Sequence, residues 1–387
     1  MYRTAMTLEI HVALLIALAV VLCLLGLVIG RMTVRHHDRA RTSDEDPAAA
    51  TASDADEAAD SGEADGPDLR KRAALVLNPT KTGADQARRL LAEVSRECGW
   101  QEPLILETTV DDPGRGPARK AVEAGVDVVI AGGGDGTVRA VADALIGTEV
   151  ELGILPMGTG NLLARNLDIV LDRPEWALRT ALSGTSALID TGTLRVDPDE
   201  AGTPFLVMAG IGFDAQVMGT VNEDLKDRVG WLAYVEAGSR QLKGKRVGAT
   251  VTTDDGETKH VKIRSIVAGN CGRLQGGLWL FPDAVIDDGL LDLLVVSPRN
   301  LADWVAVGAS ILGRRRRGLH TVTAQGETFT IRADDPVEVQ IDGDAHGTTD
   351  FLELAVVPSS LRVRRPSPDI KRMLRREAFG LTTSLGA

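Results

Sequence analysis

Two strand–turn–helix repeats follow each other directly in this chain, and they constrain its fold more than any other feature of the sequence. The first repeat opens with an apolar run rich in β-branched residues, 126–131, which is too short for a helix and is typical of a buried strand. The run ends in the glycine-rich turn 132–137. Apolar residues then recur at helical spacing, at Val138, Val141, Ala142 and Leu145.

The second repeat has the same plan. A short strand, 152–156, leads into a second glycine-rich turn, 157–161, and the next helix begins at Leu162. Two such turns at adjacent strand ends present bare backbone N–H groups, and glycine lets a ligand approach the backbone closely. A helix N-terminus also favours negative charge. A structural turn is the ordinary alternative for a single glycine cluster, but the pair predicts a phosphate-binding edge of the sheet.

Three further motifs accompany the two turns. Residues 78–83 read Asn-Pro-Thr-Lys-Thr-Gly, residues 282–284 read Pro-Asp-Ala, and residues 287–292 read Asp-Asp-Gly-Leu-Leu-Asp. Together with Gly-Gly-Asp-Gly-Thr at 133–137, they make residues 73–363 resemble the diacylglycerol kinase catalytic family. That family also contains sphingosine kinases and bacterial lipid kinases, and it is related in fold to the NAD kinases.

The resemblance implies an ATP-dependent lipid kinase that works with Mg²⁺. Such an enzyme transfers the γ-phosphoryl group to a lipid hydroxyl, of the diacylglycerol or sphingoid-base type, at the cytoplasmic face of the membrane. The expected partners are therefore a lipid substrate and the membrane, and a homodimer is a further candidate assembly.

Two departures from the family pattern keep other interpretations open. Many relatives carry Asn-Glu where this chain has Arg139-Ala140, and Asp where it has Leu162. Both changes remove polar groups that could contact metal or nucleotide. A non-catalytic nucleotide- or lipid-binding module is one alternative. An NAD kinase-like activity is another, because the NAD kinases share the Gly-Gly-Asp-Gly turn.

The resemblance also implies which residues contact the nucleotide. They are Asn78, Pro79, Thr80, Lys81, Thr82, Gly83, Thr108, Gly133, Gly134, Asp135, Gly136, Thr137, Gly158, Thr159, Asn161, Arg165, Asp342, Gly343 and Asp344. No Gly-Lys-Ser/Thr follows the glycines, so this is not a Walker loop. Lys81 or Arg165 is the candidate phosphate-facing cation, although either could be an ordinary solvated residue.

Two aspartates are the catalytic candidates. By resemblance, Asp288 accepts the proton of the lipid hydroxyl, because phosphoryl transfer to an alcohol needs a positioned carboxylate. Its alternative role is an ordinary Asp-Gly turn between strands. Asp135 is expected to organise Mg²⁺ or water beside the ATP phosphates, which makes it the candidate metal ligand. It could instead accept hydrogen bonds from the N–H groups of its own loop.

The pattern of elements divides the chain into two folded domains. Strand–helix alternation over 73–186 predicts an α/β nucleotide-binding domain with a parallel sheet and ligands at the strand C-termini. Short alternating segments over 187–364 predict an all-β antiparallel sandwich, interrupted by a helix at 225–243. Residues 365–387 form a basic tail.

An uncharged apolar stretch near the N-terminus, 10–30, has the length of about 20 residues that a membrane-spanning helix needs. Arginines cluster directly after it, between 31 and 41, and only Arg3 precedes it. The positive-inside rule then predicts a single-pass membrane anchor with the catalytic part in the cytoplasm. A secretory signal peptide is the alternative, although no small-residue cleavage site follows.

Composition describes the remaining segments and excludes one class of partner. Residues 31–72 are a basic stop followed by an acidic, disordered linker without large apolar side chains. A net charge of −12 and only 3% aromatic residues argue against nucleic-acid binding. Cys23, Cys98 and Cys271 are scattered, which fits a reducing compartment without a disulfide framework.

Basic clusters stand out in this acidic chain. Four consecutive arginines occupy 314–317, and a second cluster runs through 362–376 with apolar residues between the charges. Such clusters are typical of contacts with anionic lipid headgroups, and a solvated helix face is the alternative.

Overall fold

The computed structural model describes residues 71–212, 246–299, 303, 306–307 and 321–378. By its contacts, the segment 67–387 forms one compact unit. Several predicted features lie outside the described residues. They are the apolar stretch 10–30, most of the linker 31–72, the helix 225–243 and the arginine cluster 314–317.

The expectation of a membrane-spanning helix needs correction. Within the described ranges, no helix is long and apolar enough to cross a membrane. The longest helix there is an amphipathic one of 14 residues, Ala84–Glu97, whereas a span needs about 20. The described residues form an α/β domain with a β-rich region, and the transmembrane helix of the predicted fold class, with the membrane-anchored localisation that rested on it, is not supported.

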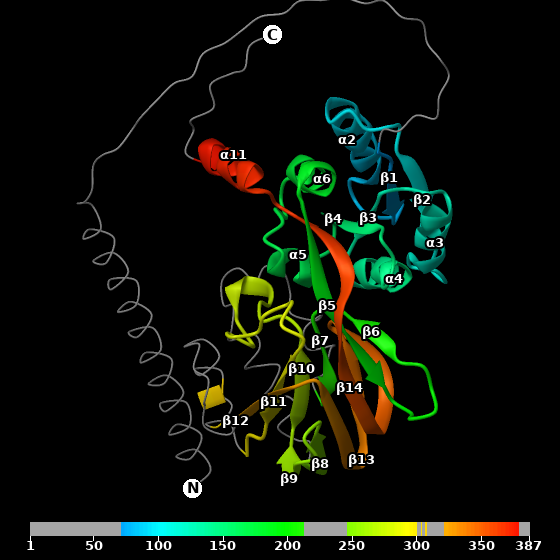
Figure 1. The fold of residues 1–387 in the computed structure, drawn as a ribbon. Coiled ribbons are helices and arrows are strands. Elements are labelled where there is room, and N and C mark those ends of the chain that lie inside the picture. Colours follow the sequence, from blue (N-terminus) through cyan, green and yellow to red (C-terminus); the bar gives the residue numbers. More distant parts are fainter. Residues whose placement is uncertain (1–70, 213–245, 300–302, 304–305, 308–320, 379–387) are drawn as a thin grey trace, which may run out of the picture. The chain divides into compact units, whose positions relative to one another are not determined.

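Strands and helices alternate through the first part of the unit, as the sequence predicts (Figure 1). In chain order the elements are β1 Ala73–Leu77, α2 Ala84–Glu97, β2 Leu104–Glu107, α3 Arg115–Glu123, β3 Val128–Gly133, α4 Asp135–Leu145, β4 Glu151–Pro156, α5 Leu162–Asn166 and α6 Pro174–Ser183. The four strands pair in parallel in the order β4-β3-β1-β2. Their carboxyl ends therefore meet at one edge of the sheet.

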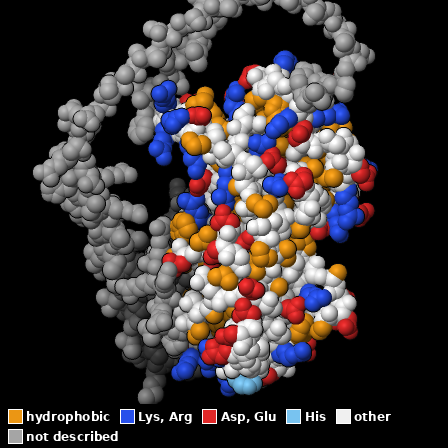
Figure 2. Space-filling view, in the orientation of Figure 1, with side chains coloured by type: hydrophobic (Ala, Val, Ile, Leu, Met, Phe, Trp, Pro, Cys, Tyr) orange, Lys and Arg blue, Asp and Glu red, His pale blue; other side chains and the backbone are white. Residues whose placement is uncertain are grey.

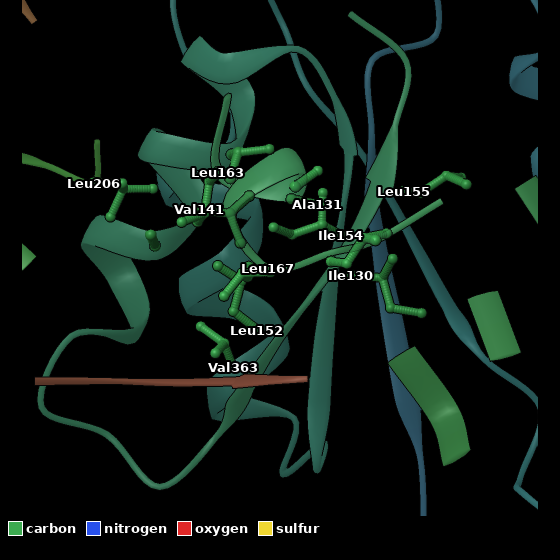
Figure 3. Close-up of a cluster of buried hydrophobic side chains, with 14 of the residues drawn as sticks. Ile130, Ala131, Val141, Leu152, Ile154, Leu155, Leu163, Leu167, Leu206 and Val363 are labelled. Atoms are coloured by element: carbon green, nitrogen blue, oxygen red, sulfur yellow. The ribbon is translucent and has the colours of Figure 1, made fainter. Parts of the chain in front are cut away.

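Apolar periodicity explains why these residues form these elements. All of β1 and β3 are buried, in keeping with strands covered on both faces. Helix α2 buries Ala84, Ala87, Leu91 and Val94 at helical spacing. Figure 3 shows side chains of β3, β4 and β14, such as Ile130, Leu152 and Val363, within one buried hydrophobic cluster. This core supports the sheet edge that carries the glycine-rich turns.

The second part of the unit is rich in antiparallel strands. Its elements are β5 Thr185–Arg195, β6 Thr203–Phe205, β7 Met208–Ile211, β8 Val247–Thr253, β9 Thr258–Ile263, β10 Ser265–Gly269, the short 3₁₀ helix Gln275–Gly277, β11 Leu291–Val296, β12 Thr321–Gly326, β13 Thr328–Ile341, β14 Asp344–Arg365 and α11 Pro368–Ala378. These strands enclose a second hydrophobic core, which includes Phe205, Phe329 and Leu354.

Hydrogen bonds join the described strands of the β-rich region to the parallel strands in one 14-stranded sheet. The predicted short strands 327–332 and 337–341 form one bent strand, β13, with register shifts in between. Strand β14 pairs with β13 and β5, and it meets β4 in parallel at Val363 and Leu152. This strand is the connection between the parallel and antiparallel parts. A domain boundary at 186/187 stays a prediction.

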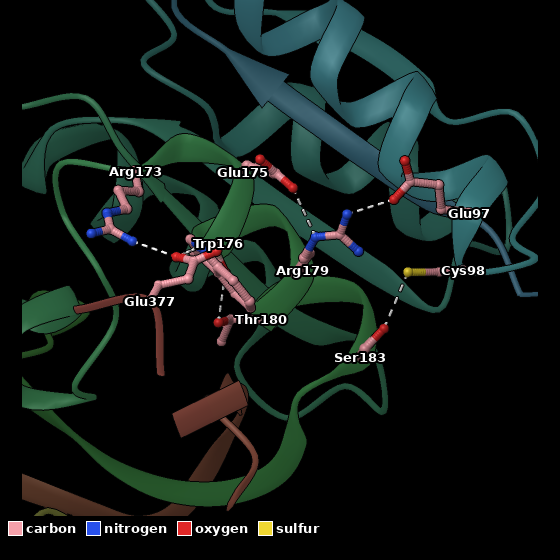
Figure 4. Close-up of polar contacts among 9 residues, drawn as sticks. All are labelled: Glu97, Cys98, Arg173, Glu175, Trp176, Arg179, Thr180, Ser183 and Glu377. Carbon is pink, nitrogen blue, oxygen red and sulfur yellow. Dashed lines mark hydrogen bonds and ion pairs between the residues drawn. The ribbon is translucent and has the colours of Figure 1, made fainter. Parts of the chain in front are cut away.

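Helix α6 is joined to its neighbours by polar contacts (Figure 4). Arg179 pairs with Glu175 on its own helix, at 3.1 Å, and with Glu97 of α2. The indole N–H of Trp176 donates to Glu377 of α11 at 3.0 Å. Figure 2 shows Lys and Arg side chains gathered over α11, where Lys371, Arg372, Arg375 and Arg376 are exposed. Their predicted contact with lipid headgroups stays a prediction.

We expect Leu152→Ala to lower the free energy of unfolding by about 2–5 kcal/mol, because it leaves a cavity where β4 meets β14. Urea unfolding of the full chain measures this. Val110→Ala is the matched control, since Val110 is 99% exposed and its truncation should change stability by less than about 0.5 kcal/mol. Equal effects of the two substitutions would contradict the described core.

Candidate active site

The two glycine-rich turns lie against each other, backbone to backbone. Strand β3 continues through Gly133, paired with Pro156 of β4, and α4 begins at Asp135, so Gly134 alone separates strand from helix. The first turn is therefore shorter than the predicted 132–137. A Cβ on Gly158 would lie 2.6 Å from the Cα of Gly134, closer than real Cβ contacts allow. Glycine is thus required at 158 by the contact between the turns themselves.

Asp135 ties the second turn to the first. Its carboxylate accepts hydrogen bonds from the backbone N–H of Asn161 at 2.8 Å and of Leu162 at 2.6 Å. Burial raises the pKa of the Asp135 carboxyl; the two N–H groups lower it, and nearby Asp342 and Asp344 raise it. The sequence left open that Asp135 accepts N–H groups of its own loop; both donors instead belong to the second turn and the start of α5.

The structure gives little support for a metal site built by the protein alone. The described residues contain no group of three or more His, Cys, Asp or Glu side chains that could hold a metal ion. Both carboxylate oxygens of Asp135 already accept backbone hydrogen bonds. The described residues therefore do not fit a protein-built Mg²⁺ site, and the assignment of Asp135 to Mg²⁺ stays a prediction.

The N–H groups of the second turn are largely engaged within the protein. Gly158 N–H donates to the side-chain oxygen of Asn161 at 3.0 Å, and the side-chain amide of Asn161 donates to the Gly158 carbonyl at 2.6 Å. The Nε group of Arg165 donates to the Gly160 carbonyl at 2.7 Å. Thr159 lies in the same turn, between Gly158 and Gly160. The second turn therefore supports the first one more than it offers donors of its own.

The N-terminus of α4 is the better anion-binding region. No side chain caps this helix, and the N–H groups of Asp135, Gly136 and Thr137 form its first turn. Such groups have no acceptor inside a helix, and the helix dipole places partial positive charge beside them. Backbone N–H groups in this arrangement bind phosphate.

The upstream motif reaches the same sheet edge. Asn78 follows β1, and its N–H donates to the Gly132 carbonyl at 3.2 Å. Its side-chain oxygen accepts hydrogen bonds from the N–H and hydroxyl of Thr80, at 3.1 and 2.8 Å, which forms a local Asx turn. Thr108 follows β2, and its N–H donates to the Leu77 carbonyl at 3.0 Å. Pro79, Lys81, Thr82 and Gly83 complete the turn into α2.

The turn between β13 and β14 contributes one exposed and one buried aspartate. Asp342 is buried, and its carboxylate accepts backbone N–H groups of Leu206, Val207 and Met208, at 3.1, 2.8 and 3.1 Å. Burial raises its pKa, although these bonds and Arg139 oppose the rise. Gly343 has a positive φ, and Asp344 is the half-exposed member. The Asp342 side chain therefore holds the connection between β6 and β7, and the start of β7, in place.

Arg139 was treated as a lost polar contact in the sequence, and the structure gives it a different role. From α4, it donates to the Ile341 carbonyl at 2.7 Å and pairs with Asp344 at 3.1 Å. A Cβ on Gly136 would lie 3.3 Å from the same Asp344 carboxylate. The turn 342–344 therefore lies beside the N-terminus of α4. The sequence held one signal for this role: Arg139 is a cation at a position where the family pattern has Asn.

The turn that carries Asp288 is held from another direction. The Asp288 carboxylate accepts the N–H of Leu290 at 3.1 Å, and both Asp287 and Asp288 are exposed. The buried Asp190 of β5 accepts the N–H of Gly289 at 2.7 Å and of Ser359 at 2.6 Å. Asp190 was missed in the sequence, where its partners lie too far away to be seen. Within the described residues, no hydrogen bond joins Asp288 to the glycine turns.

Comparison with known proteins identifies the family. Residues 72–194 match the diacylglycerol kinase catalytic domain, and residues 207–365 match the YegS C-terminal NAD kinase beta sandwich-like domain. A Pseudomonas aeruginosa protein named "Probable lipid kinase YegS-like" is 32% identical over 298 residues, which cover 76% of this chain and 94% of that protein. The chain belongs to the diacylglycerol kinase catalytic family. It is a lipid kinase.

Further relatives of this lipid kinase agree with that assignment. Diacylglycerol kinase of Bacillus subtilis is 27% identical over 283 residues, covering 72% of this chain and 91% of the relative. The crystal structure of a diacylglycerol kinase from Bacillus anthracis str. Sterne superposes with a TM-score of 0.60 at 21% identity, over 79% of this chain and 100% of that one. The structural match supports the fold, and the predicted family is confirmed.

Two alanine substitutions separate loop packing from phosphate binding in this lipid kinase. We expect Gly158→Ala to push the turns apart, to cost about 1–3 kcal/mol of stability and to weaken ATP binding. Gly134→Ala should be tolerated by the fold, because its Cβ would lie 3.5 Å from Gly158 and its φ is −91°. It should still weaken ATP binding, because a phosphate at the α4 N-terminus approaches this backbone.

Thermal unfolding and calorimetric titration with ATP measure both effects on the full chain. If Gly134→Ala binds ATP as tightly as the parent, phosphate does not approach the N-terminus of α4, and the assignment of this anion-binding region is wrong.

Proposed function

We propose that this lipid kinase transfers the γ-phosphoryl group of ATP to the hydroxyl of a lipid of the diacylglycerol or sphingoid-base type. The observation that carries the proposal is the uncapped N-terminus of α4, held at the sheet edge by the contact of two glycine turns and by Asp135. The names of the relatives, lipid kinase and diacylglycerol kinase, support the acceptor class.

The protein's contribution to nucleotide binding is positioning. The first-turn N–H groups of α4 would receive phosphate oxygens, and Asn78 and Thr108 lie at neighbouring strand ends along the same edge. In phosphoryl transfer from ATP, bound Mg²⁺ neutralises charge on the phosphates. The described residues form no metal site by themselves. The roles proposed below therefore concern only side chains and backbone groups of this chain.

Asp288 is the proposed proton acceptor. As the hydroxyl oxygen of the lipid bonds to the γ-phosphorus, the bond to the β-phosphate oxygen breaks and the hydroxyl proton passes to the carboxylate. Asp288 is exposed, so a substrate can reach it, and only its Oδ1 accepts the turn hydrogen bond from Leu290. The bond from Gly289 to the buried Asp190 holds this turn in place.

A direct experiment tests the activity itself. The full chain is incubated with radiolabelled ATP and a total lipid extract, and any lipid that gains phosphate is identified. NAD is offered in a parallel reaction. Labelled lipid supports the proposal, whereas labelled NADP without labelled lipid would contradict it.

Asp288→Asn separates a catalytic base from a turn residue. Asn can accept the same N–H bond from Leu290, so the turn should persist. We expect lipid phosphorylation to fall about 100-fold to 10,000-fold, because the general base is lost. ATP affinity should be unchanged, since Asp288 is not among the predicted nucleotide contacts.

Asp287→Asn is the matched control, because Asp287 is the exposed neighbour in the same turn. Its rate should stay close to that of the parent. A loss confined to the Asp287 variant would move the role by one residue. Full activity of both variants would show that the base lies elsewhere.

A further inference from the structure

A cavity of about 260 Å³ lies between α5 and the segment that leads to the Asp288 turn. Asn166 and Asp168 line it from the end of α5, and Arg273, Trp279, Ala284 and Ile286 line it from the segment after β10. None of these residues belongs to the predicted nucleotide contacts. The lining therefore combines a polar side with an apolar side.

Its walls continue into both parts of the proposed active site. Helix α5 begins at Leu162, whose N–H binds Asp135, and it ends at Asn166 in the cavity wall. Ile286, on the opposite wall, directly precedes Asp287 and Asp288. The Ile286 carbonyl accepts the N–H of Asp190 at 2.9 Å, and Asp190 also holds Gly289. The cavity is thus walled by the helix that follows the second glycine turn and by the segment that precedes the proposed base.

Hydrogen bonds hold the polar side in position. Asn166 and Arg273 exchange two of them: the Asn166 amide donates to the Arg273 carbonyl at 3.0 Å, and the Arg273 N–H donates to the Asn166 side-chain oxygen at 3.0 Å. The Nη1 group of Arg273 donates to the Arg165 carbonyl at 3.0 Å and pairs with Asp168. Both bonds of the guanidinium use Nη1, and a guanidinium carries five N–H donors.

Cations outnumber carboxylates around Asp168. Asp168 pairs with Arg273 and also with Lys371 of α11, at 3.5 Å, so two cations face one carboxylate. Uncharged ester and hydroxyl oxygens are acceptors for a guanidinium, whereas the ammonium group of a sphingoid base would meet a like charge.

The apolar side fits methylene groups. The Arg273 guanidinium lies 5.0 Å from the centre of the Trp279 ring, and the indole lines the cavity together with Ala284 and Ile286. Ligand sites combine an apolar wall with a few polar groups in this way. The volume is below the range of about 300–1,000 Å³ typical of drug-sized ligands, which suits the head of a lipid better than its whole length.

We propose that this cavity is the acceptor subsite, where Arg273 binds the oxygen atoms of an uncharged lipid alcohol and Trp279 and Ile286 contact its first methylene groups. The inference rests on the proposed lipid kinase function and adds the place and polarity of the acceptor. It favours an uncharged glyceride over an amino alcohol.

Filling the cavity tests its use. Ala284→Trp places a large side chain in the cavity wall, and Val285→Trp is the matched control, because Val285 is 48% exposed and lies outside the lining. With dioctanoylglycerol as substrate, we expect Ala284→Trp to raise KM about tenfold or more, within the range for altered hydrophobic pockets. KM for ATP should stay within about twofold in both variants. A general disturbance of the fold would instead change the KM for ATP as well as the KM for dioctanoylglycerol.

Removing the cation tests the polarity. Arg273→Gln keeps a polar side chain without the charge. We expect the ratio of kcat/KM for dioctanoylglycerol to that for sphingosine to fall about tenfold, because the glyceride loses a donor and the ammonium loses a repulsion. An unchanged ratio would overturn the role of Arg273.

A binding measurement without turnover completes the test. Dioctanoylglycerol added to the full chain without ATP should change the tryptophan fluorescence, and Trp279→Phe should remove that change. If the parent phosphorylates no lipid, the proposed function fails, and the fluorescence change alone decides whether the cavity binds the probe. If the parent is active and Ala284→Trp behaves like Val285→Trp, the subsite is overturned. Should Ala284→Trp not fold, the Arg273 ratio and the Trp279 signal decide whether the cavity is the acceptor subsite.

Discussion

The active-site edge depends on a close contact between the backbones of Gly134 and Gly158. Since a Cβ on Gly158 would lie 2.6 Å from the Cα of Gly134, the turns can meet only if that side chain is absent. Asp135 then closes the contact by accepting two N–H groups of the second turn. With those amides engaged, the N-terminus of α4 is the region that we propose for anions, and the two turns have unequal roles.

The β-rich part reaches this edge through a few polar side chains. Arg139 joins α4 to the turn 342–344, which lies more than 200 residues away in sequence. Asp190 holds both the Asp288 turn and the bulge at Ser359. Each is a buried or half-buried group whose partners come from distant segments, so the loss of one partner would leave a polar group without compensation. The same connections place the cavity at Arg273 between the two parts.

Several assignments changed once the contacts were known. The Asp342 carboxylate binds the backbone of residues 206–208, which gives it a structural role beside the nucleotide contact that stays a prediction. Arg139 was interpreted as a lost contact, and it pairs with Asp344. The short strands expected around 327–341 are one bent strand. In each case the local sequence pattern correctly identified a polar side chain or an extended segment. The role of that side chain or segment depended on a partner far away in the sequence.

The sequence by itself determined the alternation of strands and helices, the two glycine turns and the family, because hydrophobic periodicity and turn chemistry are properties of neighbouring residues. Only the tertiary structure decided which turn keeps its N–H groups, that Asp190 holds Gly289, and that Arg273, Trp279 and Asn166 line one cavity. Asp190 and Gly289 are 99 residues apart in the sequence, and Asn166 and Arg273 are 107 residues apart. No local pattern encodes them, because they exist only once the strands have paired and brought those segments together.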